Sequence, residues 1–221
     1  MLEDVIREYN AAVLDTDRAR ALQVVTQALQ QGARPEDIVF QVVIPGLDLM
    51  VKALSEGFDT NLAQHFMTSQ IAAEVTEKML TLFQAPPAIF GRVVIGSASG
   101  DLHTLGKRIV IGCLKAQMID VTDLGVNVSA EKFVDEAVAH QAQVIGVSAM
   151  MVHTARGEGG ASKVRQILKA RGLEDKIKLV VGGAPFRFDP DLVKLVQADG
   201  WAENGVSATK VIMDCIREVK Q

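Results

Sequence analysis

Short apolar runs rich in valine and isoleucine alternate with helical segments over the second part of the chain. The runs cover residues 92–96, 118–123, 144–148, 178–182 and, more weakly, 199–202. Between them, apolar residues recur at helical spacing, with helices expected to begin near Leu105, Ala130, Gly160, Asp189 and Val206. This alternation is typical of a parallel sheet that helices cover on both faces. It predicts a flavodoxin-like (Rossmann-like), doubly wound α/β domain with a five-stranded parallel sheet.

The first part of the chain has a different periodicity, in which apolar residues recur every three or four positions, as in Val5, Tyr9 and Val13. A last helix of this kind is expected over about residues 60–83. Boundary residues divide the pattern: Asp15 and Asp17 as N-caps, Gly32 at a helix end, Pro35 at a helix start, Pro45 starting or kinking the next helix, and Gly57 closing it. The pattern predicts an N-terminal bundle of antiparallel helices.

The pair Pro86-Pro87 separates the two patterns. We therefore expect two domains, a helical bundle with its linker over residues 1–87 and an α/β domain over residues 88–221. Together they form an α plus α/β chain.

Composition excludes several classes of partner and location. The 23 basic residues are outnumbered by 27 acidic ones without any basic cluster, which argues against direct binding of nucleic acid. No apolar run approaches the roughly 20 residues that span a bilayer. Cys113 and Cys215 form no CxxC motif and are interpreted as buried thiols in a reducing compartment. A cytoplasmic protein without membrane contact is expected.

Unusual residues follow three of the predicted strands. Asp101 and His103 come after the first strand, Ser148 ends the third, and Gly182-Gly183 ends the fourth. Each has an ordinary explanation alone, as a solvated loop histidine, a helix-capping serine or a glycine turn. With strand order 2-1-3-4-5, however, these strands are neighbours, and their carboxyl ends meet at one crevice. A ligand site at this edge is therefore predicted.

These segments, taken in order, also resemble a known set of motifs. Asp101-Leu-His103-Thr-Leu-Gly106, Ser148-Ala-Met150 and Gly182-Gly183 are similar to the DxHxxG, SxL and GG motifs of cobalamin-binding domains. The likeness extends through residues 123–128 and 180–185 to the corrinoid proteins of methyltransferase systems and, with the helical half, covers essentially the whole chain. Met150 departs from the leucine of the motif but preserves its volume. The loop over residues 151–160 is longer and richer in glycine than the usual third-strand loop.

The resemblance implies a role for each motif residue. His103 would ligate cobalt in place of the cofactor's own dimethylbenzimidazole, and Asp101 would hold the other ring nitrogen, with Ser148 as the next member of a proton relay. Gly106, Gly182 and Gly183 would leave a slot for the displaced nucleotide tail. The implied cofactor-binding set is Gly100, Asp101, Leu102, His103, Thr104, Leu105, Gly106, Ser148, Met150, Gly182 and Gly183.

The function that the resemblance implies is methyl carriage, with methylcobalamin formed in turnover. The expected partners are a methyltransferase specific for the methyl donor, a second methyltransferase that passes the methyl group to tetrahydrofolate or a thiol, and a reductive activator. The chain would be a component of that enzyme system without catalysing the transfer alone.

Alternatives remain open at this point. A cobalamin-responsive regulator or photoreceptor resembles this architecture, but such proteins usually carry a tryptophan in the helical domain, whereas the single tryptophan here is Trp201. The small subunit of an adenosylcobalamin mutase and a flavodoxin-like module without cobalamin are the others. Phe66, Met67 and Ile71 are candidates for covering the corrin, although a core position explains them better. His65 is expected at the surface, and His153 has no spaced partner for a second metal site.

Overall fold

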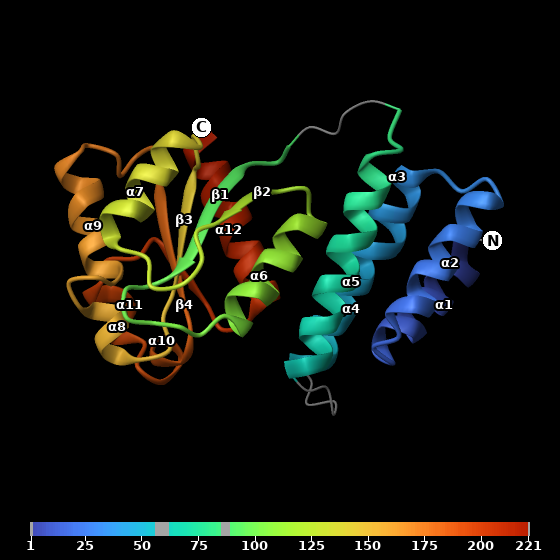
Figure 1. Cartoon of the computed structure of the whole chain (residues 1–221), viewed down its shortest axis with the longest axis horizontal. Helices are drawn as coiled ribbons and strands as arrows, with labels where there is room; N and C mark the ends of the chain where they lie inside the picture. Colours follow the sequence, from blue (N-terminus) through green and yellow to red (C-terminus); the bar gives the residue numbers. More distant parts are fainter. Residues whose placement is uncertain (1, 56–61, 85–88, 221) are drawn as a thin grey trace. The chain divides into compact units, whose positions relative to one another are not determined.

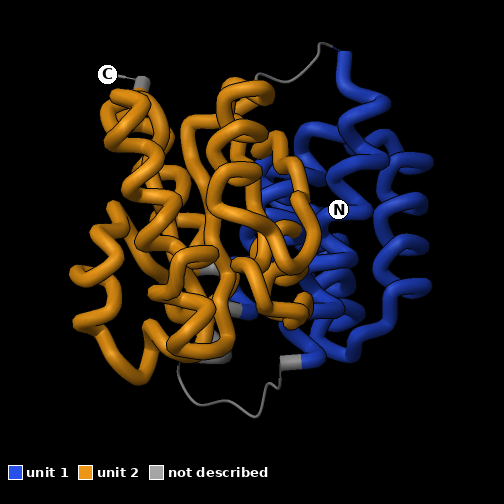
Figure 2. Tube along the Cα trace, turned by 60° about the vertical axis from the view of Figure 1, so that its left-hand side comes forward, with its two compact units in different colours: residues 1–88, 112–118 blue, residues 89–111, 119–221 orange. Residues whose placement is uncertain are grey.

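The computed structural model describes residues 2–55, 62–84 and 89–220 of the chain. The chain divides into two compact units, residues 1–88 with 112–118 and residues 89–111 with 119–221 (Figure 2). The predicted domain boundary at Pro86-Pro87 and the helix end predicted at Gly57 lie outside the described residues.

The first unit is helical, as the periodicity predicted. Asp17 caps the second helix, since its carboxylate accepts a hydrogen bond from the Arg20 N–H at 2.9 Å. Gly32 follows that helix with a φ of +91°, which glycine adopts at no steric cost. The elements are α1 (Leu2–Leu14), α2 (Arg18–Gln30), α3 (Pro35–Asp37), the π-helix η1 (Ile38–Val43), α4 (Ile44–Ser55) and α5 (Leu62–Leu80) (Figure 1).

Pro45 distorts a continuous helix instead of starting a new one. The segments α3, η1 and α4 follow one another without a break. Because proline has no N–H, it cannot donate to the carbonyl four residues earlier. The turn before it is widened, and the N–H of Ile44 donates to the carbonyl of Val39, five residues back.

The prediction that His65 lies at the surface is wrong. His65 is only 3% exposed, and its Nε2 has no hydrogen-bond partner among the described residues. Burial lowers the pKa of its imidazole. Three small polar residues of α5 are buried too, namely Thr68, Ser69 and Thr76. Because such residues are usually exposed, the sequence pattern did not predict that this helix is buried. Ile71 is fully buried, as a core position requires.

The second unit contains a five-stranded parallel sheet with the predicted order β2-β1-β3-β4-β5. The doubly wound fold is confirmed. Its first and third strands pair so that Ser97 lies beside Ser148, and the third and fourth pair so that Ser148 lies beside Gly182. The strands are β1 (Arg92–Ser97), β2 (Asp120–Asp123), β3 (Val144–Ser148), β4 (Lys178–Gly182) and β5 (Gly200–Ala202).

Helices cover this sheet on both faces (Figure 1). Phe133 of α7 and Leu168 of α9 join Ile145, Val147 and other strand residues in one buried cluster. On the opposite face α12 packs against β3, β4 and β5. No described helix is long and apolar enough to cross a membrane. The helices are α6 (Leu105–Ala116), α7 (Ala130–Ala139), α8 (Val152–Arg156), α9 (Ala161–Ala170), α10 (Ala184–Phe188), α11 (Asp191–Leu195) and α12 (Gly205–Lys220).

Two short helices, α8 and α10, were not predicted. Each has five residues, which is too short for apolar periodicity to be recognised. Both follow strands of the predicted ligand edge, so they bear directly on the site.

Candidate cofactor site

The loop that follows β1 buries one carboxylate at the carboxyl edge of the sheet. Gly100 adopts a φ of +79°, and the Asp101 N–H donates back to the carbonyl of Ala98 at 2.9 Å, which closes a tight turn. The turn directs the Asp101 side chain inward, and the residue is only 1% exposed. A buried carboxylate must find hydrogen-bond donors to offset its lost hydration.

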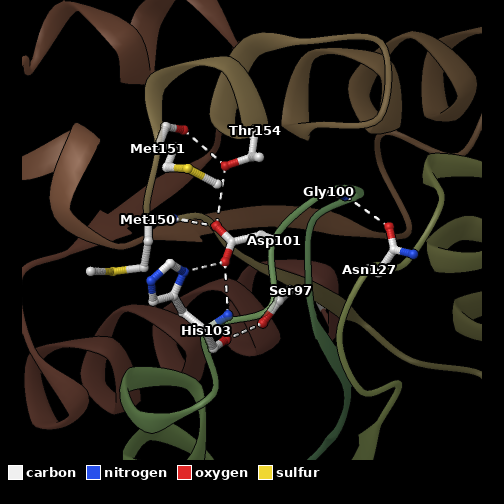
Figure 3. A network of polar contacts seen from close by, with 8 residues as sticks. All are labelled: Ser97, Gly100, Asp101, His103, Asn127, Met150, Met151 and Thr154. Atoms are coloured by element: carbon white, nitrogen blue, oxygen red, sulfur yellow. Dashed lines mark hydrogen bonds and ion pairs between the residues drawn. The ribbon is translucent and has the colours of Figure 1, made fainter.

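Asp101 orients His103 through two contacts on one oxygen (Figure 3). Asp101 Oδ1 lies 2.8 Å from His103 Nδ1 and accepts the His103 backbone N–H at 3.0 Å. Because an ionised carboxylate only accepts, Nδ1 must carry the ring proton, which leaves a lone pair on Nε2. The His103 side chain is 59% exposed. The arrangement therefore directs Nδ1 to Asp101 and leaves Nε2 as the nitrogen available to a ligand.

The second oxygen of Asp101 is held by the segment after β3. Asp101 Oδ2 accepts the Met150 N–H at 2.6 Å and the Thr154 hydroxyl at 3.1 Å (Figure 3). Burial alone raises the pKa of Asp101, but the hydrogen bonds from Met150, His103 and Thr154 outweigh it and leave the pKa below its ordinary value. Asp101 is thus ionised at neutral pH.

Ser148, predicted to be the next relay member, makes no described hydrogen bond to this carboxylate, whereas the Thr154 hydroxyl donates to Asp101 Oδ2. Ser148 ends β3, where strand alternation places its side chain on the opposite sheet face from Val147. The chain then turns, so that a backbone N–H of Met150 and a hydroxyl from α8 reach Asp101. The sequence signal for Thr154 was its place in the unusual loop over residues 151–160.

The Thr154 hydroxyl has two acceptors and one proton. Its oxygen lies 3.1 Å from Asp101 Oδ2 and 2.9 Å from the Met151 carbonyl oxygen. Thr154 is 2% exposed, so water does not replace either contact easily. The hydroxyl can therefore turn between the carboxylate and the carbonyl according to the charge on Asp101.

The structural reason for a glycine differs among the three predicted slot positions. A Cβ added at Gly106 would meet no atom within 4 Å, and one at Gly182 only the Ala202 carbonyl oxygen at 3.6 Å. The packing of the chain itself leaves room at both positions, which is consistent with space kept for a ligand. Gly183 has a φ of +116°, and a Cβ there would overlap the Ala149 carbonyl oxygen. Gly183 is thus required by the turn after β4.

The remaining predicted site residues lie around the Asp101–His103 pair. Leu102, Leu105 and Met150 are 70%, 42% and 41% exposed, respectively, so the edge of the site offers apolar contact area. Thr104 is exposed, and its carbonyl accepts the Arg108 N–H at 2.9 Å in the first turn of α6. The structure therefore brings together residues from β1–α6, β3–α8 and β4–α10.

Two residues whose side chains hydrogen-bond to the backbone of this loop were not predicted from the sequence. Ser97, which is fully buried, donates its hydroxyl to the His103 carbonyl at 2.7 Å. Asn127 accepts the Gly100 N–H at 2.8 Å (Figure 3). Neither residue type is unusual at a strand end or in a loop, so only the fold reveals these contacts.

The site suits a metal that is held mainly by an organic cofactor. No cluster of three or more His, Cys, Asp or Glu residues that could hold a bare ion occurs within residues 2–55, 62–84 and 89–220. His103 instead offers one nitrogen, fixed by a carboxylate, beside an apolar edge and uncrowded glycines. This donor set fits a cobalt corrinoid, to which His103 would supply the one protein ligand. The fold and site define a cofactor-binding α/β protein of that class.

Comparison with known proteins gives the family. The model of the B12 binding domain family matches residues 91–210, and a second model, also described as a B12 binding domain, matches residues 5–58. The chain belongs to the B12-binding family, and the resemblance to corrinoid proteins seen in the sequence is confirmed.

Named relatives cover both units. The chain is 30% identical to the dimethylamine corrinoid protein of Methanosarcina barkeri over 93% of this chain and 94% of that protein. It is 29% identical to trimethylamine corrinoid protein 1 of Methanosarcina acetivorans over 95% of this chain and 94% of that protein. Its fold matches a chain of the methanol:cobalamin methyltransferase complex MtaBC from M. barkeri with a TM-score of 0.77 and 24% identity, covering 97% of this chain and 80% of that one.

Proposed function

We propose that this protein is a corrinoid methyl carrier that binds cobalamin through His103, with the dimethylbenzimidazole displaced, and passes methyl groups between two methyltransferases. The observation that carries the proposal is the His103–Asp101 pair, in which Nδ1 is held at 2.8 Å while the His103 side chain stays 59% exposed. Residues 1–87 are proposed as the cap with its linker, and residues 88–221 as the cofactor domain. We place the protein in the cytoplasm.

When bound, the corrinoid supplies the cobalt that accepts and releases the methyl group. The protein's own contribution is to keep a neutral imidazole in one orientation. Ionised Asp101 holds the proton on Nδ1 and leaves Nε2 as the nitrogen that would ligate the metal. Gly106 and Gly182 leave space where a bulkier residue would obstruct the nucleotide tail.

Asp101 can also take up a proton. The Thr154 hydroxyl then turns to the Met151 carbonyl and frees Asp101 Oδ2 to be protonated. Protonation of Asp101 would couple the orientation of His103 to proton uptake.

The names of the relatives guide the choice of partners. Methylated amines are the first donor class to test, because the similar proteins are called trimethylamine and dimethylamine corrinoid proteins. We propose a donor-specific methyltransferase on one side and a tetrahydrofolate- or thiol-dependent methyltransferase on the other. A reductive activator would restore cobalt that has been oxidised.

The test is spectroscopic and uses two histidine variants. The full chain is loaded with cobalamin and reduced to the cobalt(II) state, and nitrogen coupling from labelled histidine is measured by electron paramagnetic resonance. The wild type and His153→Ala, a change at another exposed histidine of the same edge, should show one axial histidine nitrogen. His103→Ala should lose it. Equal spectra for wild type and His103→Ala would refute the assignment of the ligand.

Methyl carriage is tested separately. The cofactor on the protein should become methylated only when a cognate methyltransferase and its methylated amine are both added. A loaded protein that never accepts a methyl group from any such pair, and whose cofactor state instead changes its oligomeric state, would favour the regulator.

A further inference from the structure

Asn127, between β2 and α7, contacts the turn that carries Asp101 from a separate part of the chain. Its side-chain Oδ1 accepts the Gly100 N–H at 2.8 Å (Figure 3). The same oxygen lies 3.5 Å from the Ser99 hydroxyl. Its backbone N–H donates to the Asp101 carbonyl at 3.0 Å. One residue therefore holds the backbone on both sides of the Gly100–Asp101 peptide.

The backbone of Asn127 explains why its contacts converge in this way. Asn127 has a φ of +53°, in the left-handed region that asparagine tolerates better than most residues. The next residue, Val128, bridges to Ala98 and donates its N–H to the Ser97 carbonyl at 3.0 Å. Asn127 is thus fixed relative to the end of β1, and its left-handed turn brings both its N–H and its side-chain oxygen to the loop.

The turn held by Asn127 determines where Asp101 points. Gly100 itself has a φ of +79°, so the loop follows a narrow path between Ala98 and Asp101. Asp101 then uses both carboxylate oxygens on partners at fixed distances, His103 on one and Met150 with Thr154 on the other. A small rotation of the Gly100–Asp101 peptide would move the carboxylate away from His103 Nδ1.

We infer that Asn127 is a positioning residue for the cobalt ligand, acting through the Gly100–Asp101 peptide to hold His103 in the orientation that ligation requires. The inference rests on the proposed role of His103 as the lower ligand. It assigns Asn127 no contact with the cofactor.

Three variants separate the side-chain acceptor from the backbone conformation. Asn127→Gly keeps the positive φ but removes the acceptor. Asn127→Asp keeps both an acceptor oxygen and tolerance of the left-handed region. Gln141→Gly is the matched control, because Gln141 is also exposed, also has a φ of +53°, and lies just before the amino end of β3, away from the site.

The first measurement needs no cofactor. Amide hydrogen exchange of Gly100 in the apo chain, followed by NMR, should become roughly five- to ten-fold faster in Asn127→Gly, as expected for the loss of one hydrogen bond. It should return to near the wild-type rate in Asn127→Asp and stay unchanged in Gln141→Gly.

The second measurement is the axial nitrogen coupling of cobalt(II) in the loaded protein. Asn127→Gly should populate a form without His103 coordination several-fold more than the wild type, and Asn127→Asp should restore ligation. If Gly100 exchange accelerates while ligation stays at the wild-type level, or if neither changes, Asn127 has no positioning role. If the wild type itself lacks His103 coordination, the proposed function fails first, and the two failures are therefore distinguishable.

Discussion

Removing the Thr154 hydroxyl should loosen the Asp101–His103 pair, whereas removing the Ser148 hydroxyl should not. Thr154→Val preserves the shape of a side chain that is 2% exposed and deletes the donor that lies 3.1 Å from Asp101 Oδ2. Hydrogen bonds to charged groups contribute about 1.5–3 kcal/mol. Because this contact is long and its proton is shared with Met151, we expect the lower end, a loss of about 1.5 kcal/mol. The pKa of Asp101 should rise toward its ordinary value.

The fluorescence of Trp201 allows this loss of stability to be measured in the α/β unit, which contains Thr154. Trp201 is the only tryptophan of the chain and packs beside the core cluster of the α/β unit. Urea unfolding followed by its fluorescence should show the Thr154→Val midpoint lowered by about 1 M. In the cobalamin-loaded variant, the axial nitrogen signal of His103 should weaken, since a less firmly held carboxylate orients the imidazole less well.

Ser148→Ala is the matched control for this experiment. It also deletes one hydroxyl near the end of β3, but that hydroxyl does not bond to Asp101, so stability and ligation should both stay close to wild type. A Ser148→Ala effect equal to or larger than that of Thr154→Val would refute the argument that Thr154, and not Ser148, supports Asp101. So would a Thr154→Val variant with unchanged midpoint and unchanged ligation.

Three further predictions concern Tyr9 in the helical unit and two of the glycines at the site. Tyr9, the only tyrosine, is 1% exposed, and burial raises its phenol pKa well above the ordinary value. The neutral phenol stabilises the folded state fully below about pH 10 and less as the pH rises further. Phenolate absorbance should therefore appear together with loss of helical circular dichroism. A smooth titration of Tyr9 near pH 10 with the helices intact would contradict this prediction. Gly183→Ala should cost about 3 kcal/mol or more through the overlap with Ala149. Gly106→Ala should leave stability unchanged or slightly higher but weaken cobalamin binding, measured by equilibrium dialysis, and unchanged affinity would count against the slot.

The periodic parts of the fold were predictable because local spacing encodes them. The strands at residues 144–148 and 178–182 were predicted with the bounds that the structure has, since each is a β-branched run buried on both faces. The five-residue helices α8 and α10 were not, because they contain little more than one turn. His65 was misplaced because polar neighbours on α5 concealed the burial of that helix.

The sequence by itself determined the type of chemistry at this site. Residue types and strand order alone show an acid, an imidazole and glycines in one loop. They also show a serine and a glycine pair at the ends of the third and fourth strands. They were sufficient to predict a ligand site at one edge of the sheet, and the resemblance of these motifs to those of cobalamin-binding domains then implied one histidine ligand for a cobalt corrinoid.

Only the tertiary structure decided which side chains hold the loop that carries Asp101 and His103. Thr154, Ser97 and Asn127 come from different elements, and their contacts with the loop depend on distances of about 3 Å or less that no spacing rule specifies. The structure also separated Gly183, required by its backbone, from Gly106 and Gly182, where the chain leaves space. The physical reason is that motif residues are set by local chemistry, whereas their partners are set by how distant segments pack.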